Sequence, residues 1–319
     1  MLSPVNFHAR SAVRFGGAGA KLEYQQLAGF FTGMAAREDN AANALPALRP
    51  GLQALAMFVQ LRRLLEAKFL ELAARATSEP PTPANPVPSW KPELQELSRL
   101  PESNMSLGAD IVQSYPDQAQ KLRSAYANST LLLEQKDLQK PAGNDYQALN
   151  SIFAEQEAQT TGMNRYSKAL FVGSGPQPNT VLAYARYAGK VKGIDIEESA
   201  IDATRDIAEQ SGGKISFEKA SGYDFNYKGF SHIGIAVMVP DKKRVLQQIS
   251  RTADPGAIVI MRTVDGFRGA MYGGIDAKDL KDFDQLEKVS TLRGTDHNIT
   301  HALVLRKKGS PFSINPHES

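Results

Sequence analysis

Cysteine is absent from this sequence of 319 residues, and so are long apolar runs. Without cysteine the chain has no disulfide, no thiolate metal ligand and no cysteine nucleophile. No apolar segment approaches the roughly 18 residues that a membrane helix needs. The first residues also lack the uninterrupted apolar stretch of a signal peptide. These absences predict a protein without a membrane span, and the cytoplasm is its expected compartment.

A strong charge of one sign is lacking too. The formal net charge is +3, and no block of about five basic residues occurs, so a nucleic acid is not an expected partner. With 42% hydrophobic and 22% charged residues, the composition is typical of a globular chain. A small-molecule partner is compatible with this composition, and the sequence does not indicate an oligomeric state.

The most informative stretch is a glycine turn between an apolar run and a helical pattern. Residues 169–172 are predicted to form a buried strand, and Gly173-Ser174-Gly175 a turn before a helix at 180–187. For the glycines alone, a turn that merely reverses the chain is the alternative. Pro176 and Pro178 remove two backbone N–H donors that a pyrophosphate would use. The turn therefore favours a nucleoside without phosphates, such as that of S-adenosylmethionine.

A second apolar run, at 191–196, ends in Asp195 and Ile196. Asp195 follows the glycines by about 20 residues, the spacing at which an acidic residue binds ribose in nucleotide-binding βαβ units. The two stretches together predict a nucleoside pocket.

The chain as a whole is predicted to consist of helical segments followed by an αβ part. A helical extension at 1–77, with a loose arm at 1–20 and helices at 21–37 and 51–77, precedes a stiff, extended proline-rich linker at 78–90. A second helical region follows, and its predicted helices are at 91–100, 106–115, 117–139 and 144–160. The αβ part covers 161–308, and a tail covers 309–319.

Seven strands are predicted in the αβ part, at 169–172, 191–196, 214–218, 231–237, 256–262, 285–291 and 299–306. Helices are expected between the first five, whereas only a turn separates the last two. This order is typical of a doubly wound α/β sheet with an antiparallel last strand. We therefore predict a class I methyltransferase-like (Rossmann-like) fold.

Three segments, at 171–180, 193–196 and 262–272, resemble the nicotianamine synthase-like family in this order. The third is the most specific, because Arg262, Arg268 and Tyr272 are interleaved with Gly266 and Gly269. The resemblance covers about residues 92–308. It extends to the family's bacterial metallophore aminobutanoyltransferases and to azetidine-2-carboxylate-forming enzymes. In this family S-adenosylmethionine is consumed as a substrate for its aminocarboxypropyl arm, and methylthioadenosine leaves.

The resemblance also implies residues that bind the substrate. Gly173, Ser174 and Gly175 are expected to wall the nucleoside and the methionine amino group, and Asp195 to bind the ribose beside Ile196. The turn at 220–224 is expected to face adenine through Ser221 and Tyr223, with Asp224 or the backbone as the polar contact. Met238 is expected beside the sulfonium, and Arg262 and Arg268 are candidates to bind carboxylates, since a guanidinium fork fits a carboxylate.

Three residues are implied as catalytic: Glu134, Tyr166 and Tyr272. Glu134 is the expected base, although its segment from Tyr126 matches the family only partly and has Ser129 where the family has tyrosine. The tyrosines are expected to surround the sulfonium by cation–π attraction or to bond the amine. Asn298 is a further candidate. His297 and His301 would lie about 13 Å apart along a strand, too far to share a metal, so no metal is expected.

The expected activity is that of an alkyl transferase or cyclase. An amine attacks the methionine Cγ of S-adenosylmethionine, and methylthioadenosine is released. Ring closure by the substrate's own amine, to azetidine-2-carboxylate, is favoured slightly over transfer to a second amine. A methyltransferase and a non-catalytic nucleoside-binding module are the alternatives.

Overall fold

The computed structural model describes residues 41–99, 105–137, 145–275, 279–293 and 300–309, with the backbone alone for 41–54, 134–137 and 145–149. The predicted arm, the helix at 21–37 and the tail from 310 lie outside these residues. Five described helices precede the sheet: α2 (Ala41–Ser78), α3 (Trp90–Leu97), α4 (Met105–Ser114), α5 (Pro116–Asp137) and α6 (Asp145–Thr160). No described helix is long and apolar enough to cross a membrane.

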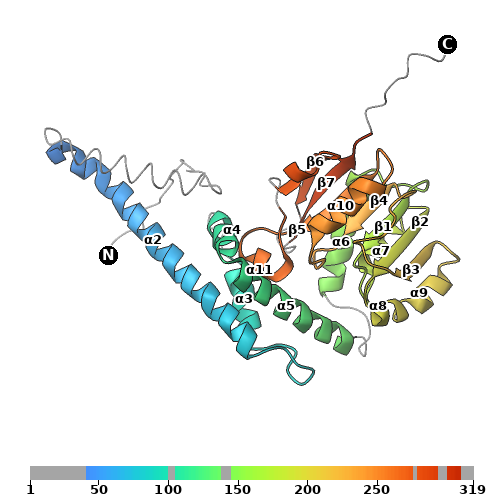
Figure 1. Ribbon diagram of the computed structural model, residues 1–319, viewed down its shortest axis with the longest axis horizontal. Coiled ribbons are helices and arrows are strands. Elements are labelled where there is room, and N and C mark those ends of the chain that lie inside the picture. Colours follow the sequence, from blue (N-terminus) through green and yellow to red (C-terminus); the bar gives the residue numbers. More distant parts are fainter. Residues whose placement is uncertain (1–40, 100–104, 138–144, 276–278, 294–299, 310–319) are drawn as a thin grey trace, which may run out of the picture.

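α2 lies along the outer side of α3 and α5 (Figure 1). Its buried residues Phe69, Leu72, Ala73 and Ala76 recur at helical spacing and pack into the core of the helical region. The described helix includes ten residues before the start that the apolar pattern predicted, because residues 41–50 are helical as well.

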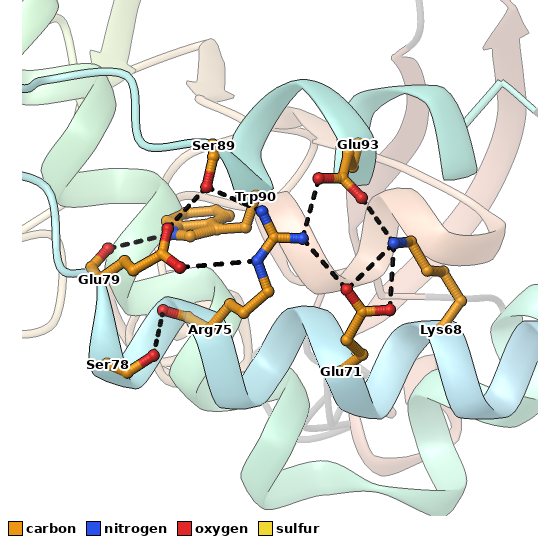
Figure 2. Close-up of polar contacts among 8 residues, drawn as sticks. All are labelled: Lys68, Glu71, Arg75, Ser78, Glu79, Ser89, Trp90 and Glu93. Atoms are coloured by element: carbon orange, nitrogen blue, oxygen red, sulfur yellow. Dashed lines mark hydrogen bonds and ion pairs between the residues drawn. The ribbon is translucent and has the colours of Figure 1, made fainter.

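The proline-rich segment between α2 and α3 folds back on itself, so the predicted extended linker is wrong. The backbone N–H of Thr82 donates to the carbonyl of Asn85 at 3.1 Å, which closes a turn. Figure 2 shows the ends of the segment joined: Ser89 Oγ donates to Glu79 at 2.6 Å, and Trp90 Nε1 donates to the Glu79 carbonyl at 3.0 Å. Proline fixes φ but leaves the direction of the chain to such turns.

The sheet has seven strands in the order β3-β2-β1-β4-β5-β7-β6. They are β1 (Lys168–Val172), β2 (Lys190–Asp195), β3 (Ile215–Lys219), β4 (His232–Ile235), β5 (Ile258–Thr263), β6 (Leu286–Arg293) and β7 (His301–Lys307). β1 to β5 pair in parallel, and β7 lies antiparallel between β5 and β6. This topology confirms the predicted class I methyltransferase-like fold (Figure 1).

Helices connect most of the parallel strands, as predicted: α7 (Asn179–Tyr184), α8 (Glu198–Asp202), α9 (Arg205–Gln210) and α10 (Lys242–Thr252). The connection from β3 to β4 is an exception, because residues 220–231, all of them described, form no helix. Glycine, asparagine and aspartate in this segment favour turns, and Gly229 has φ +82°.

One hydrophobic core joins the helical region to the αβ part. It contains Trp90, Leu122 and Tyr126 from the helices, together with Phe267 and Tyr272 from the chain after β5. That chain forms η3 (Gly266–Arg268) and α11 (Gly269–Tyr272). α5 and α11 are in direct contact, so the helices are fixed beside the sheet.

Candidate active site

A cavity of about 460 Å³ lies at the carboxyl ends of β1, β2 and β4. Ligands bind at this edge of open α/β sheets, where the order of the strands reverses. Residues of α5 and α6 line the opposite side, so the cavity lies between the sheet and the helical region.

The glycine turn after β1 forms one wall, and its N–H groups bind within the protein. Gly173 and Gly175 have φ +78° and +64°, a conformation that glycine adopts without strain. The N–H groups of Gly173 and Ser174 donate to the Ile194 carbonyl at 2.8 and 3.1 Å, and that of Gly175 donates to Asp195 Oδ2 at 2.9 Å. This turn therefore offers a phosphate none of the N–H donors that a dinucleotide-binding turn provides.

Asp195 is held in place by the backbone. Its Oδ2 accepts from Gly175, and its Oδ1 accepts from the N–H of Glu197 at 3.1 Å. Each carboxylate oxygen keeps further acceptor capacity, and the residue lines the cavity. The ends of β1 and β2 approach each other closely at Gly193. A Cβ at this position would lie 2.9 Å from the Ser174 Cβ, which is too close, so the approach needs glycine.

Ser174 provides a polar group that the described protein atoms leave unbonded. Its Oγ is buried at the cavity wall and has no hydrogen-bond partner among the residues that the structure describes. A buried hydroxyl without a partner is costly.

Most of the binding residues that we predicted lie together in the cavity wall: Gly173, Ser174, Gly175, Asp195, Ile196, Ser221, Tyr223, Met238 and Arg262. Their roles in binding remain predictions. Asp224 is exposed and does not belong to the lining. Of the two contacts expected for adenine at this turn, the backbone is therefore the one that the geometry favours.

Arg262 lines the cavity, but its fork is occupied. Its Nε and Nη2 donate to the two carboxylate oxygens of Glu157 at 2.8 and 2.7 Å, and Tyr184 Oη donates to Glu157 at 2.9 Å. Both partners of this ion pair are buried, and the guanidinium lies over the Phe153 and Phe171 rings. Burial and Glu157 raise the pKa of Tyr184 well above its usual range. The Nε and Nη2 groups of Arg262, which were expected to bind a substrate carboxylate, thus bind the carboxylate of Glu157 instead.

Three predicted residues, Tyr166, Tyr272 and Arg268, do not line the cavity. Tyr166 is 80% exposed and stacks on Arg165. It precedes β1 and so lies at the amino ends of the strands, opposite the cavity. Tyr272 is buried against Tyr126, their hydroxyls 3.1 Å apart, and is not in the lining. Arg268 is outside the lining as well, and burial lowers the pKa of its guanidinium.

Some predicted residues lie outside the description altogether. The side chain of Glu134 and residues His297 and Asn298 fall outside the described residues. His301 lies 3.6 Å from Asp265, between Nδ1 and Oδ2, and burial lowers its pKa. Among the described residues, no three histidine or carboxylate side chains are grouped so that they could hold a metal ion.

Four residues in the cavity wall or beside it were not among the predicted site residues. Asn128 and Thr130 of α5 and Asn150 of α6 line the cavity, and Glu157 of α6 lies behind it on Arg262. Asn128 lies in the segment from Tyr126 that partly resembles the family, whereas nothing in the sequence distinguishes Thr130 and Asn150 from other polar residues on helices. Glu157 did carry a signal, because it shares a helix face with buried Phe153 and Ala154, where an unpaired carboxylate is rare.

Negative charge exceeds positive charge in the lining. Among the residues that the structure describes, its charged members are Asp195, Glu197 and Arg262, and Arg262 is neutralised by Glu157. The excess of carboxylate favours a cationic ligand over an anionic one.

A family profile and several curated proteins are similar to this chain. The sequence profile described as "Nicotianamine synthase protein" matches residues 139–311, more than half of the chain. The L-histidine 2-aminobutanoyltransferase of Pseudomonas aeruginosa is 29% identical over 128 residues, which are 39% of this chain and 49% of that protein. The nicotianamine synthase of Solanum lycopersicum is 27% identical over 156 residues, 45% of this chain and 48% of that protein. The chain thus matches about half the length of these curated relatives.

A solved structure of similar shape gives the same assignment of fold. A mutant of MtNAS in complex with S-adenosylmethionine aligns with a TM-score of 0.62 at 18% identity, over 76% of this chain and 98% of that chain. At this level of identity the likeness establishes the fold alone. From the match to the family profile over more than half of its length, the chain belongs to the nicotianamine synthase family.

Proposed function

We propose that the chain is an S-adenosylmethionine-consuming enzyme that transfers the 3-amino-3-carboxypropyl group to an amine and releases 5′-methylthioadenosine. The observation that carries the proposal is the turn at Gly173, whose N–H groups are used within the protein, next to Asp195 in a cavity with excess carboxylate. Such a site suits a nucleoside that bears a positive charge and no phosphate.

The reaction is a displacement at carbon. The amine lone pair forms a bond to Cγ of the methionine arm, and the bond between Cγ and sulfur breaks. Its electron pair passes to sulfur, so the sulfonium becomes the neutral thioether of methylthioadenosine. The attacking nitrogen then loses a proton to solvent or to a base. Because a sulfonium has three carbons open to attack, the position of the amine decides the product.

The residues of the cavity suit the different parts of this substrate. Asp195 is fixed by two N–H groups in an orientation suited to ribose hydroxyls. Met238 and Val239 after β4 give an apolar surface. The names of the relatives, a 2-aminobutanoyltransferase and nicotianamine synthases, accord with transfer of this arm.

Ring closure is a second candidate, in which the substrate's own amine attacks Cγ and forms azetidine-2-carboxylate. One observation favours it: Ser129, where the family has tyrosine, accepts from Lys91 Nζ at 2.9 Å and does not line the cavity. This position therefore gives a second amine no contact in the described helical wall, whose polar lining residues are Asn128, Thr130 and Asn150.

Mass spectrometry of the purified protein with S-adenosylmethionine alone tests the proposal. Methylthioadenosine with an equal amount of azetidine-2-carboxylate supports ring closure. Methylthioadenosine with a condensed product supports transfer between two substrate molecules. If neither appears, the assay is repeated with single amino acids, histidine first. S-adenosylhomocysteine without methylthioadenosine would identify a methyltransferase, and tight binding without turnover would identify a binding module; either refutes the proposal.

A further inference from the structure

Lys242 is a buried lysine bound to four backbone carbonyls. It lies in the first turn of α10 and is 2% exposed. Its Nζ donates to the carbonyls of Val237 at 2.7 Å, Val239 at 3.0 Å, Tyr272 at 3.1 Å and Gly273 at 3.0 Å. Burial, and to a lesser extent Arg123, lowers its pKa to about 7. The four acceptors in turn favour the ammonium, which has three N–H donors where the neutral amine has two.

The four carbonyls come from two segments far apart in the sequence. Val237 and Val239 belong to the loop after β4, which lines the cavity together with Met238. Tyr272 and Gly273 are at the carboxyl end of α11, where helical carbonyls lack partners in their own helix. One ammonium group therefore fastens the wall of the cavity to the end of a short helix.

α11 is fastened from the other side by the helical region. Arg123 Nη1 of α5 donates to the Gly269 carbonyl at 3.1 Å. The Tyr126 and Tyr272 rings meet edge to face with their centroids 5.3 Å apart. α11 is only four residues long and thus depends on these neighbours for its position. The loop at 237–239, called the wall loop below, is therefore connected through Lys242 to α11, and α11 is connected to α5.

We propose that Lys242 is a positioning residue of the active site, which holds the wall at 237–239 against the methionine end of S-adenosylmethionine by tying it to α11. The inference rests on the proposed function for the identity of the ligand. Lys242 does not line the cavity and acts only through the wall loop. Without its ammonium, four carbonyls lose a charge-assisted donor and the wall loses its link to α11.

Two substitutions separate this role from stability alone. Lys242→Met keeps the unbranched side chain as far as Cε and removes every donor, whereas Lys242→Gln keeps two N–H donors. The control is Lys243→Met, because Lys243 is the next residue of the same helix, its side chain is 48% exposed, and it pairs with Asp279 on the surface. Binding of S-adenosylmethionine and of adenosine is measured by calorimetry, at a temperature where circular dichroism shows each variant folded.

The expected result is a graded loss of S-adenosylmethionine affinity, about tenfold or more for Lys242→Met and smaller for Lys242→Gln. Adenosine affinity is expected to change less, because adenosine lacks the methionine end, and Lys243→Met to leave both affinities unchanged. Equal losses for both ligands, or none in a folded variant, would overturn the proposal. If both variants fail to fold, Lys242 serves the fold itself and the proposal is likewise wrong.

These affinities do not depend on which reaction follows. A wild-type protein that binds S-adenosylmethionine but releases no methylthioadenosine would refute the proposed function, while the graded affinities would still support the role of Lys242. A wild-type protein that does not bind S-adenosylmethionine would refute both.

Discussion

Replacing Glu157 by glutamine is expected to destabilise the protein strongly, because it breaks a buried ion pair from one side. Glu157 is fully buried, and its Arg262 partner is 6% exposed at the side chain. The variant retains Arg262 as a buried cation without its carboxylate, and it weakens the acceptor of Tyr184 Oη. Removing one partner of such a pair costs about 3–5 kcal/mol of the free energy of unfolding.

Urea unfolding followed by circular dichroism measures this loss. With a slope of about 3 kcal/mol per molar urea, the midpoint is expected to fall by about 1 M or more. The matched control is Glu155→Gln on the same helix, whose partner Arg186 is 65% exposed at the side chain. Exposed pairs contribute about 0–1 kcal/mol, so the control midpoint is expected to change little.

A double variant tests the cause. Glu157→Gln combined with Arg262→Met removes the buried charge as well, and is expected to recover much of the lost stability, since a buried pair is often replaceable by apolar groups. Equal midpoints for Glu157→Gln and Glu155→Gln would refute the reasoning. In that case Arg262 does not depend on Glu157, and its role as a carboxylate-binding residue would have to be reconsidered.

Three further predictions concern binding, product and pH. Asp195→Asn is expected to weaken S-adenosylmethionine binding by about tenfold or more in calorimetry without changing the product, and Asp202→Asn, on the exposed side of α8, to leave affinity unchanged. Asn150→Ala is expected to change the ratio of amine product to methylthioadenosine in mass spectrometry more than it changes affinity. Burial lowers the pKa of His232 below its ordinary 6.5. As the pH falls, the imidazole is therefore protonated in the unfolded chain before it is protonated in the folded protein. The free energy of unfolding is therefore expected to fall as pH drops below about 6.5, and the urea midpoint of His232→Gln to depend less on pH.

The sheet side of the site was predictable from the sequence because its determinants are local. The turn at Gly173, its spacing to Asp195 and the strand ends around them follow from short patterns and from the rule that ligands bind at the carboxyl ends of parallel strands. The same rule explains why Tyr166 was wrongly placed in the site. It stands next to β1 in the sequence, but before the strand, and therefore at the opposite edge of the sheet.

The helical side was not predictable in the same way. Which face of α5 or α6 meets the sheet depends on packing between distant segments, and a polar residue such as Asn150 carries no local sign of it. The contacts of Tyr272 with Tyr126 and of Lys242 with four carbonyls arise from the position of α11, a helix of only four residues. Arg262 was correctly placed at the cavity, whereas its binding of Glu157 could be inferred only from the apolar face that Glu157 shares.

The two walls of the cavity therefore have different consequences for function. The strand ends supply Asp195 and the Gly173 turn, which suit the nucleoside whatever reaction follows. The choice among three electrophilic carbons of a sulfonium depends on where the nucleophile stands, and the wall opposite the strand ends is made by α5 and α6. Because α11 binds α5 directly and is joined to the loop at 237–239 through Lys242, a displacement of the helical wall is expected to reach this part of the cavity wall. In this fold the reaction is thus expected to be selected by the helices and the ligand by the sheet.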